Sequence, residues 1–205
     1  MYINIKRIRA LEEREHAKIE IFGERETERL RKIKNEARRA ESASALLALA
    51  ELAGNRSQMK IKREESGRPA FETYTGDLSL SHSASLCVAA LTESGRVSVD
   101  IEKIDESRHT KDVAARFFSE KEKELVANAS EPTVEFFRIW TKREAAAKCK
   151  GQNLATSLSD DMLYEGLFIK TCLVEHNTEK YCLSTASDTE DEITILADKD
   201  ITFKF

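Results

Sequence analysis

The order of apolar and polar residues divides this chain into strand-like and helix-like stretches. Residues 2–8 alternate between the two classes, which predicts a short opening strand. Residues 24–52 lack Gly and Pro and are rich in helix formers, so they predict one long helix, or two in tandem, ended by Gly54-Asn55. Because the first half of this stretch is charged all round and the second is apolar on most faces, only the second half is expected to be fully buried.

The middle of the chain has the short period of β-strands. Strands are predicted at residues 78–80 and 86–91, joined by the loop Ser81-His82-Ser83-Ala84. A hairpin through residues 93–95 is expected to lead into a further strand at residues 97–101. Since successive side chains of a strand point to opposite faces, the valines and isoleucine of this strand share one face, and Asp100 and Glu102 share the other.

Helical periodicity returns and is then replaced by strand patterns. Helices are predicted at residues 110–117, at 119–127 and at 133–150, the last closed by Gly151. The spacing of Ser119 and Glu122 is that of a capping box at the second of these helices. Four strands are expected at residues 167–174, 181–185, 193–196 and 201–203. Both halves therefore run from helices to strands, which is compatible with two similar subdomains.

Composition favours a folded protein with a sizeable core. The chain has 205 residues, 40% of them hydrophobic and 34% charged, with only 2 Pro and 7 Gly. No apolar run approaches the roughly 20 residues that a membrane span requires, and the N-terminus lacks the pattern of a signal peptide, so we expect a cytoplasmic protein that does not bind membranes. The cysteines form no CxxC pair, which predicts reduced, mostly buried thiols. These are Cys87, Cys149, Cys172 and Cys182.

The charge is distributed unevenly along the chain. Residues 1–63 carry 16 Lys and Arg against 10 Asp and Glu, whereas residues 64–205 carry 17 against 27. A basic first part suggests an anionic partner. Nucleic acid is disfavoured because the overall pI is near 5.7 and no basic stretch is interleaved with aromatic residues. A small polyphosphate ligand fits better.

Three short motifs could carry chemistry. Asp100 and Glu102 lie two residues apart on a strand, so their carboxylates are about 7 Å apart and could bind one hard cation. Alone, such a pair is more typical of a solvated strand edge. On the helix that follows, Trp140, Glu144 and Lys148 share one face, which is also compatible with a simple Glu–Lys ion pair. Gly67-Arg68-Pro69 and Ser81-His82-Ser83 could cradle a phosphate, or be ordinary polar turns.

The order and spacing of these motifs resemble those of the 4′-phosphopantetheinyl transferase superfamily. That family has a G-K-P element, an S-H-S loop, a G-x-D-I-E strand and a W-T-x-K-E-A-x-x-K helix, and the resemblance covers roughly residues 30–160. It is closest to the long, single-chain type that activates peptide synthetases such as that for surfactin. The resemblance implies an α/β fold of the α+β type with two pseudo-symmetric subdomains, residues 1–92 and 93–205, each with helices on a small, mainly antiparallel sheet. It also implies a monomer.

The resemblance further implies a reaction of the holo-acyl-carrier-protein synthase type. Phosphopantetheine would pass from coenzyme A to a serine of an acyl or peptidyl carrier protein, with Mg²⁺ as cofactor. Asp100, Glu102 and Glu144 would bind the Mg²⁺; Glu144 would also be the general base, and Lys148 would contact the phosphates. The remaining coenzyme A contacts would be Arg39, Arg63, Arg68, Pro69, Ser81 and His82.

Several positions depart from the family pattern. Arg68 replaces the lysine of G-K-P, and Arg143 replaces the lysine before Glu144; both keep the charge but change the hydrogen-bond geometry. Ser98 and Asn153 stand where glycine is common. None of these changes removes a predicted metal ligand.

Two other functions are compatible with parts of the sequence. One is a non-catalytic module that binds coenzyme A or a carrier protein, although binding alone would not require the whole set of carboxylates. The other is an interaction protein built on the charged helix at residues 24–42. Carrier docking is expected near the helices of residues 119–150.

Overall fold

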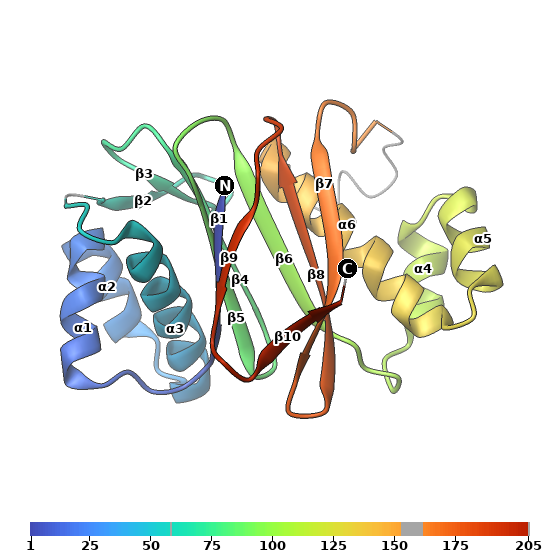
Figure 1. Cartoon of the computed structure of the whole chain (residues 1–205), viewed down its shortest axis with the longest axis horizontal. Helices are drawn as coiled ribbons and strands as arrows, with labels where there is room; N and C mark the ends of the chain where they lie inside the picture. The colour runs from blue at the N-terminus through green and yellow to red at the C-terminus, as the bar shows by residue number, and fades with distance from the viewer. Residues whose placement is uncertain (58, 153–161, 205) are drawn as a thin grey trace.

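Two four-stranded sheets form the middle of the structure, with helices on either side (Figure 1). The structure, a computed structural model, describes residues 1–57, 59–152 and 162–204. The strands of the first sheet are, in spatial order, β4 (Asp77–Ser83), β5 (Leu86–Thr92), β1 (Tyr2–Arg7) and β9 (Thr194–Ala197). Those of the second sheet are β10 (Ile201–Lys204), β7 (Phe168–His176), β8 (Glu179–Ser187) and β6 (Val97–Lys103).

Strand pairing is antiparallel throughout the two sheets except between β1 and β9, which run parallel. A separate two-stranded ribbon joins β2 (Ile61–Arg63) to β3 (Pro69–Phe71). The predicted fold class, helices on small and mainly antiparallel sheets, is therefore confirmed. The predicted boundary between residues 92 and 93 stays a prediction, and β9 pairs across it with β1.

Helices lie on the outer side of each sheet. On the side of the first sheet lie α1 (Glu13–Ile19), the 3-10 turn η1 (Glu20–Phe22), α2 (Glu24–Lys32) and α3 (Glu36–Ala53). On the side of the second sheet lie α4 (Thr110–Phe117), α5 (Glu120–Asn128) and α6 (Pro132–Lys150). Within the described ranges, no helix combines the length and apolarity that a bilayer crossing demands.

Local sequence signals explain where these helices begin and end. The stretch predicted as one helix or two is two, because the Asn35 side chain accepts the N–H of Arg38 and starts α3 afresh. Only the later part of α3 is buried, as predicted. The Ser119–Glu122 capping box at α5 is present, and Gly151 ends α6 in the left-handed conformation, with φ 66°.

The connections near the middle of the chain correct two predictions. Ser81, His82 and Ser83 belong to strand β4, and the turn follows them at Ala84, whose φ is 51°. The predicted hairpin through residues 93–95 is wrong, because β6 leaves the first sheet and pairs with β8. The short helix α1 and the β2–β3 ribbon were not predicted.

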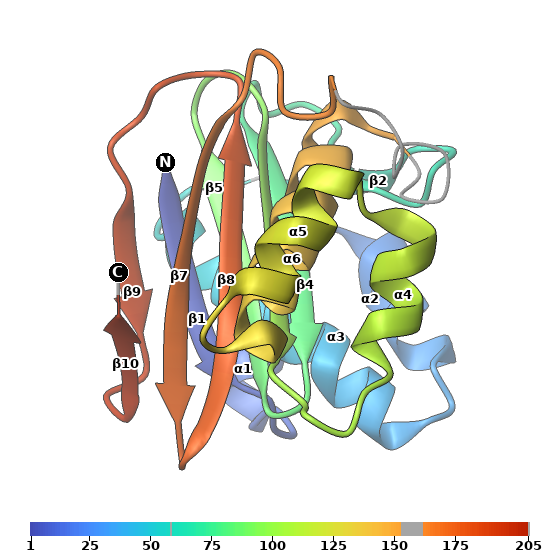
Figure 2. The ribbon, with the colours of Figure 1, turned by 90° about the vertical axis from the view of Figure 1, so that its right-hand side faces the viewer.

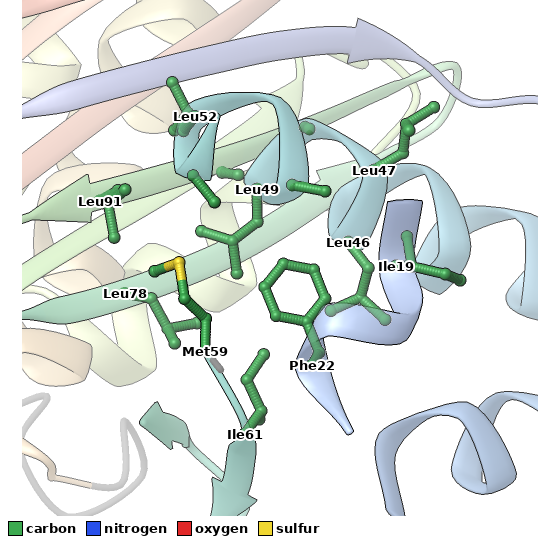
Figure 3. Packing of buried hydrophobic residues seen from close by; sticks show 14 of the residues in the cluster. Ile19, Phe22, Leu46, Leu47, Leu49, Leu52, Met59, Ile61, Leu78 and Leu91 are labelled. Carbon is green, nitrogen blue, oxygen red and sulfur yellow. The ribbon is translucent and has the colours of Figure 1, made fainter. Parts of the chain in front are cut away.

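Apolar side chains fill three layers. Ile3, Ile5 and Val88 of the first sheet meet Val99 and Ile101 of the second, so the two sheets pack face to face. The outer face of the first sheet packs on α3, with Phe22, Leu46 and Leu49 at the centre (Figure 3). On the second sheet, α6 lies across β6, β7 and β8 (Figure 2). All four cysteines are buried and free, as predicted.

Truncation of Leu46 tests the packing of α3 on the first sheet. Leu46 is 1% exposed, so Leu46→Ala is expected to lower the free energy of unfolding by about 3 kcal/mol through lost apolar burial and a residual cavity. Urea denaturation followed by circular dichroism measures this change. Leu125→Ala is the matched control, since Leu125 is 50% exposed and its truncation should change stability little. Equal effects of the two substitutions would contradict the packing.

The edge strands β4 and β6 lie side by side and are joined through side chains. Four short polar side chains of β4 each accept one backbone N–H of β6. Asp77 Oδ2 accepts from Val97 at 2.9 Å, Ser79 Oγ from Val99 at 3.1 Å, Ser81 Oγ from Ile101 at 3.4 Å and Ser83 Oγ from Lys103 at 3.0 Å. We call these eight residues the β4–β6 junction. The junction supplies hydrogen-bond acceptors to the backbone N–H groups on the edge of β6 that faces away from β8.

Candidate active site

The site forms where β6 meets α6. Asp100 and Glu102 project from the face of β6 opposite its apolar row, as predicted, and Asp100 is only 4% exposed. The helix is held against the strand by Ser98, whose hydroxyl donates to the carbonyl of Ala145 at 2.6 Å. Packing of α6 against β6 thereby places Glu144 and Lys148 next to the two carboxylates of the strand.

The aromatic side chains of α6 anchor this arrangement. Trp140, on the helix face predicted to carry Glu144 and Lys148, is 9% exposed and stacks on Phe136 with ring centroids 6.0 Å apart. Both rings belong to a core cluster with Cys182 of β8. The helix thus has a packed aromatic end and a polar end at the carboxylates.

Lys148 contacts Asp100 directly. Its Nζ lies 2.6 Å from Asp100 Oδ1 and 3.4 Å from the carbonyl oxygen of Val99. Burial alone would lower the pKa of Lys148, but the charge and hydrogen bond of Asp100 and the charges of Glu144 and Glu102 outweigh it and raise the pKa. Lys148 is therefore a protonated ammonium surrounded by the carboxylates of Asp100, Glu102 and Glu144.

The carboxylates of Asp100 and Glu102 disfavour the charged form of Glu144. Burial, followed by the charge of Asp100, raises the pKa of Glu144 to about 7, and Glu102 adds to the effect while Lys148 and Arg108 oppose it. Burial and Asp100 likewise raise the pKa of Glu102. Within the part of the chain that the structure describes, the Glu144 carboxylate takes part in no hydrogen bond or ion pair. It is therefore available to a ligand or a proton.

The donor set suits a hard cation. Oδ2 of Asp100 is buried and has no hydrogen-bond partner among the described residues, which is costly unless a ligand satisfies it. Carboxylate oxygens are the ligands that Mg²⁺ prefers, and Mg²⁺ commonly takes one or two of them together with substrate phosphates. Across residues 1–57, 59–152 and 162–204, however, no three Asp, Glu, His or Cys side chains form a ready ligand shell. The donor chemistry fits Mg²⁺, and substrate oxygens would have to complete the coordination.

Arg108 belongs to the site and was not predicted. Its guanidinium lies 3.8 Å from Glu102 Oε2 and 5.7 Å from the ring centroids of both Phe137 and Trp140. It lies just before α4, outside every motif used above. An arginine two residues before an amphipathic helix has no distinctive spacing, so only the folded arrangement connects it to the carboxylates.

Ser81 and His82 lie next to this group on β4. Ser81 Oγ donates to Asp100 Oδ1 at 3.0 Å, so its closest described partner is a predicted metal ligand. His82 points to the other face of the strand, where its half-exposed ring has Nδ1 3.6 Å from Glu41 Oε2. Both remain compatible with contacts to the nucleotide.

The other residues predicted to contact coenzyme A have structural partners of their own. Arg63 pairs with the buried Glu26, Nη2 to Oε1 2.6 Å, and Arg68 forms a two-pronged pair with Asp77. Arg39 is half exposed and donates to the carbonyl of Ile33 at 3.4 Å. Among the described contacts, none joins these arginines or Pro69 to Asp100, Glu102, Glu144 or Lys148. Asn153 lies outside the described residues.

A cavity of about 870 Å³ lies between α5 and α6 but holds none of the predicted site residues. Its lining includes Arg143, which forms a buried ion pair with Glu122, Nη1 to Oε2 2.6 Å. Arg143 thus takes a structural position one residue before Glu144. The reactive side chains lie together where β6 meets α6, and not in this cavity.

Comparison with known proteins agrees with the geometry. Residues 96–195 match the family model of the 4′-phosphopantetheinyl transferase superfamily. This segment contains β6 and α6, and with them Asp100, Glu102, Glu144 and Lys148. This match confirms the resemblance to the superfamily over the segment that carries β6 and α6.

Curated proteins with similar sequences are named 4′-phosphopantetheinyl transferases, in agreement with the family model. The 4′-phosphopantetheinyl transferase HetI of Nostoc sp. is 29% identical over 104 residues, which cover 48% of this chain and 44% of that protein. The 4′-phosphopantetheinyl transferases AcpT of Salmonella typhi and Escherichia coli O157:H7 are 32% and 33% identical over 125 residues. Those matches cover 59% of this chain and 65% and 64% of the two proteins. The matched part thus spans less than two thirds of each relative.

Proposed function

We propose that this protein transfers the 4′-phosphopantetheine group of coenzyme A to a serine of an acyl or peptidyl carrier protein and releases adenosine 3′,5′-bisphosphate. The observation that carries the proposal is the meeting of Asp100, Glu102, Glu144 and Lys148 where β6 packs on α6. Three carboxylates that repel one another can be stabilised by a bound cation, and the ammonium among them can contact phosphate groups. The family match and the relatives' names support the same reaction.

Each residue has a distinct role in the proposed mechanism. Asp100, Glu102 and Glu144 would hold Mg²⁺, which supplies neutralisation of the pyrophosphate oxygens when it is bound. Glu144, whose pKa is raised to about 7, accepts the proton of the carrier serine as the serine oxygen attacks the β-phosphorus. Lys148 and Arg108 place positive charge beside the phosphate oxygens. Phosphoryl transfer requires mainly such positioning and neutralisation.

The proposal includes the long, single-chain type of transferase acting as a monomer. Support comes from the two four-stranded sheets, each flanked by its own helices, which a single chain supplies. In this arrangement the nucleotide would lie toward β4, near His82 and Ser81. Of the basic residues in the first 63 positions, Arg39 and Arg63 would lie toward its phosphates.

A mass measurement tests the reaction. Purified apo carrier proteins incubated with this protein, coenzyme A and Mg²⁺ are expected to gain one phosphopantetheine group, and chelation of the metal should prevent the gain. A panel of acyl and peptidyl carriers identifies which class is served. Tight binding of coenzyme A with no mass gain on any carrier would favour the non-catalytic binding module instead.

A further inference from the structure

Two serines of the β4–β6 junction each make a second hydrogen bond, in addition to the one that they accept from the backbone of β6. Ser81 Oγ accepts the N–H of Ile101 at 3.4 Å and also lies 3.0 Å from Asp100 Oδ1. Ser83 Oγ accepts the N–H of Lys103 at 3.0 Å and lies 3.1 Å from Glu102 Oε2. Each hydroxyl therefore bridges the backbone of β6 and a carboxylate on the same strand.

The chemistry of a hydroxyl fixes the direction of both contacts. A serine has one O–H donor and two acceptor lone pairs. The backbone N–H can only donate, so the serine oxygen accepts from it. The single O–H of the serine then donates to the carboxylate. One oxygen of each carboxylate is thereby held on β4, and the other oxygen of Asp100 stays buried without a partner among the described residues.

We propose that Ser81 and Ser83 are positioning residues that orient Asp100 and Glu102 for the cation. The inference rests on the proposed function and refines it, because Ser81 then acts through a metal ligand and not only beside the nucleotide. Hydrogen bonds from outer groups commonly fix the orientation of metal-binding carboxylates and raise metal affinity. The SxS spacing on β4 matches the DxE spacing on β6, so one strand supplies a holder for each ligand of the other.

The junction contains its own control. Ser79 Oγ accepts the N–H of Val99 at 3.1 Å, as the other two serines accept theirs. The β6 residue before Val99 is Ser98, whose hydroxyl donates to the carbonyl of Ala145, so Ser79 has no carboxylate to hold. Ser79→Ala therefore removes the junction contact alone, whereas Ser81→Ala and Ser83→Ala remove the junction contact and the carboxylate contact.

The test is titration of the intact protein with Mn²⁺ in the presence of coenzyme A, followed by electron paramagnetic resonance of the free ion. Ser81→Ala and Ser83→Ala are each expected to raise the Kd for Mn²⁺ about 10-fold, and Ser79→Ala by less than about 2-fold. The melting temperatures of Ser81→Ala and Ser83→Ala should fall by similar amounts, and that of Ser79→Ala by less, because it loses one contact and they lose two. Ser83→Thr keeps the hydroxyl and should restore most of the affinity.

Kinetics supply a second readout. If the serines act through the carboxylates, both variants need more Mg²⁺ for half-maximal rate, and excess Mg²⁺ recovers kcat. The inference is overturned by unchanged Mn²⁺ affinity in Ser81→Ala and Ser83→Ala, or by a rise in the KM of Ser83→Ala for coenzyme A that excess Mg²⁺ does not reduce. Either result leaves the proposed function standing. Failure of the unaltered protein to bind Mn²⁺ overturns both.

Discussion

Substitution of Glu144 by glutamine is expected to lower the rate of phosphopantetheine transfer at least about 100-fold while the protein stays folded. Glutamine keeps the shape of the side chain but cannot accept a proton and is a weaker ligand for Mg²⁺. The rate is measured by mass spectrometry of the carrier protein in a single turnover, with coenzyme A in excess. Glu144 is chosen because its carboxylate has no described partner and its pKa is raised to about 7.

The stability of this variant provides an internal check. A carboxyl group whose pKa is higher in the folded than in the unfolded protein costs stability as the pH rises above its ordinary range. Glutamine avoids this cost, so at about pH 8 the variant should melt at the same or a higher temperature than the unaltered protein. Glu13→Gln is the control, because Glu13 is exposed on α1, on the far side of the sheets. Full activity of Glu144→Gln would refute its role.

Replacement of Arg68 by methionine is expected to cost about 4 kcal/mol of stability. The side chains of Arg68 and Asp77 are 9% and 13% exposed, and their two contacts measure 3.0 and 2.5 Å. Arg68 also donates to the carbonyl of Val97 at 3.1 Å. Methionine removes the positive charge and leaves the Asp77 carboxylate buried without its partner, which is the costly situation for a buried ion pair. Urea denaturation measures the loss.

A double-mutant cycle separates the lost pair from lost packing. In Arg68→Met/Asp77→Asn no buried charge remains, so the double variant should regain a large part of the stability. The exposed pair of Arg25 and Glu72 serves as control, and Arg25→Met should change stability by well under 1 kcal/mol. An Arg68→Met variant as stable as the parent would show that the pair contributes nothing. The affinity of the folded Arg68→Met variant for coenzyme A tests the predicted coenzyme A contact separately.

Local patterns predicted most elements of this fold. Capping residues and apolar periodicity identified α4, α5 and α6 closely, since these signals depend on neighbours within a few residues. The same patterns could not show that β6 leaves its neighbour β5 and pairs with β8, because the alternation of a strand does not encode its partner. The predicted loop at Ser81–Ser83 failed for a related reason. Small polar residues suggest a turn, but on β4 they serve as acceptors for an adjacent edge.

The site could be predicted in its members but not in its contacts. Motif order led to Asp100, Glu102, Glu144 and Lys148, and the structure brings all four together. It pairs Lys148 with Asp100, whereas the sequence suggested either an ion pair with Glu144 or a contact with the phosphates. Arg108 could not be found, because its relation to Glu102 and to the rings of α6 depends on how the β6–α4 connection folds back.

The parallel pairing of β1 with β9 has a consequence for the newly made chain. Ile3 pairs with Ile195, so β1 leaves the ribosome well before β9 and waits for a partner encoded almost two hundred positions later. At about 5–20 residues per second, that delay is roughly 10–40 s. During this time the outer edge of β1 is an open template for another strand. Translation speed and chaperone binding would therefore influence how much of this protein reaches its native state.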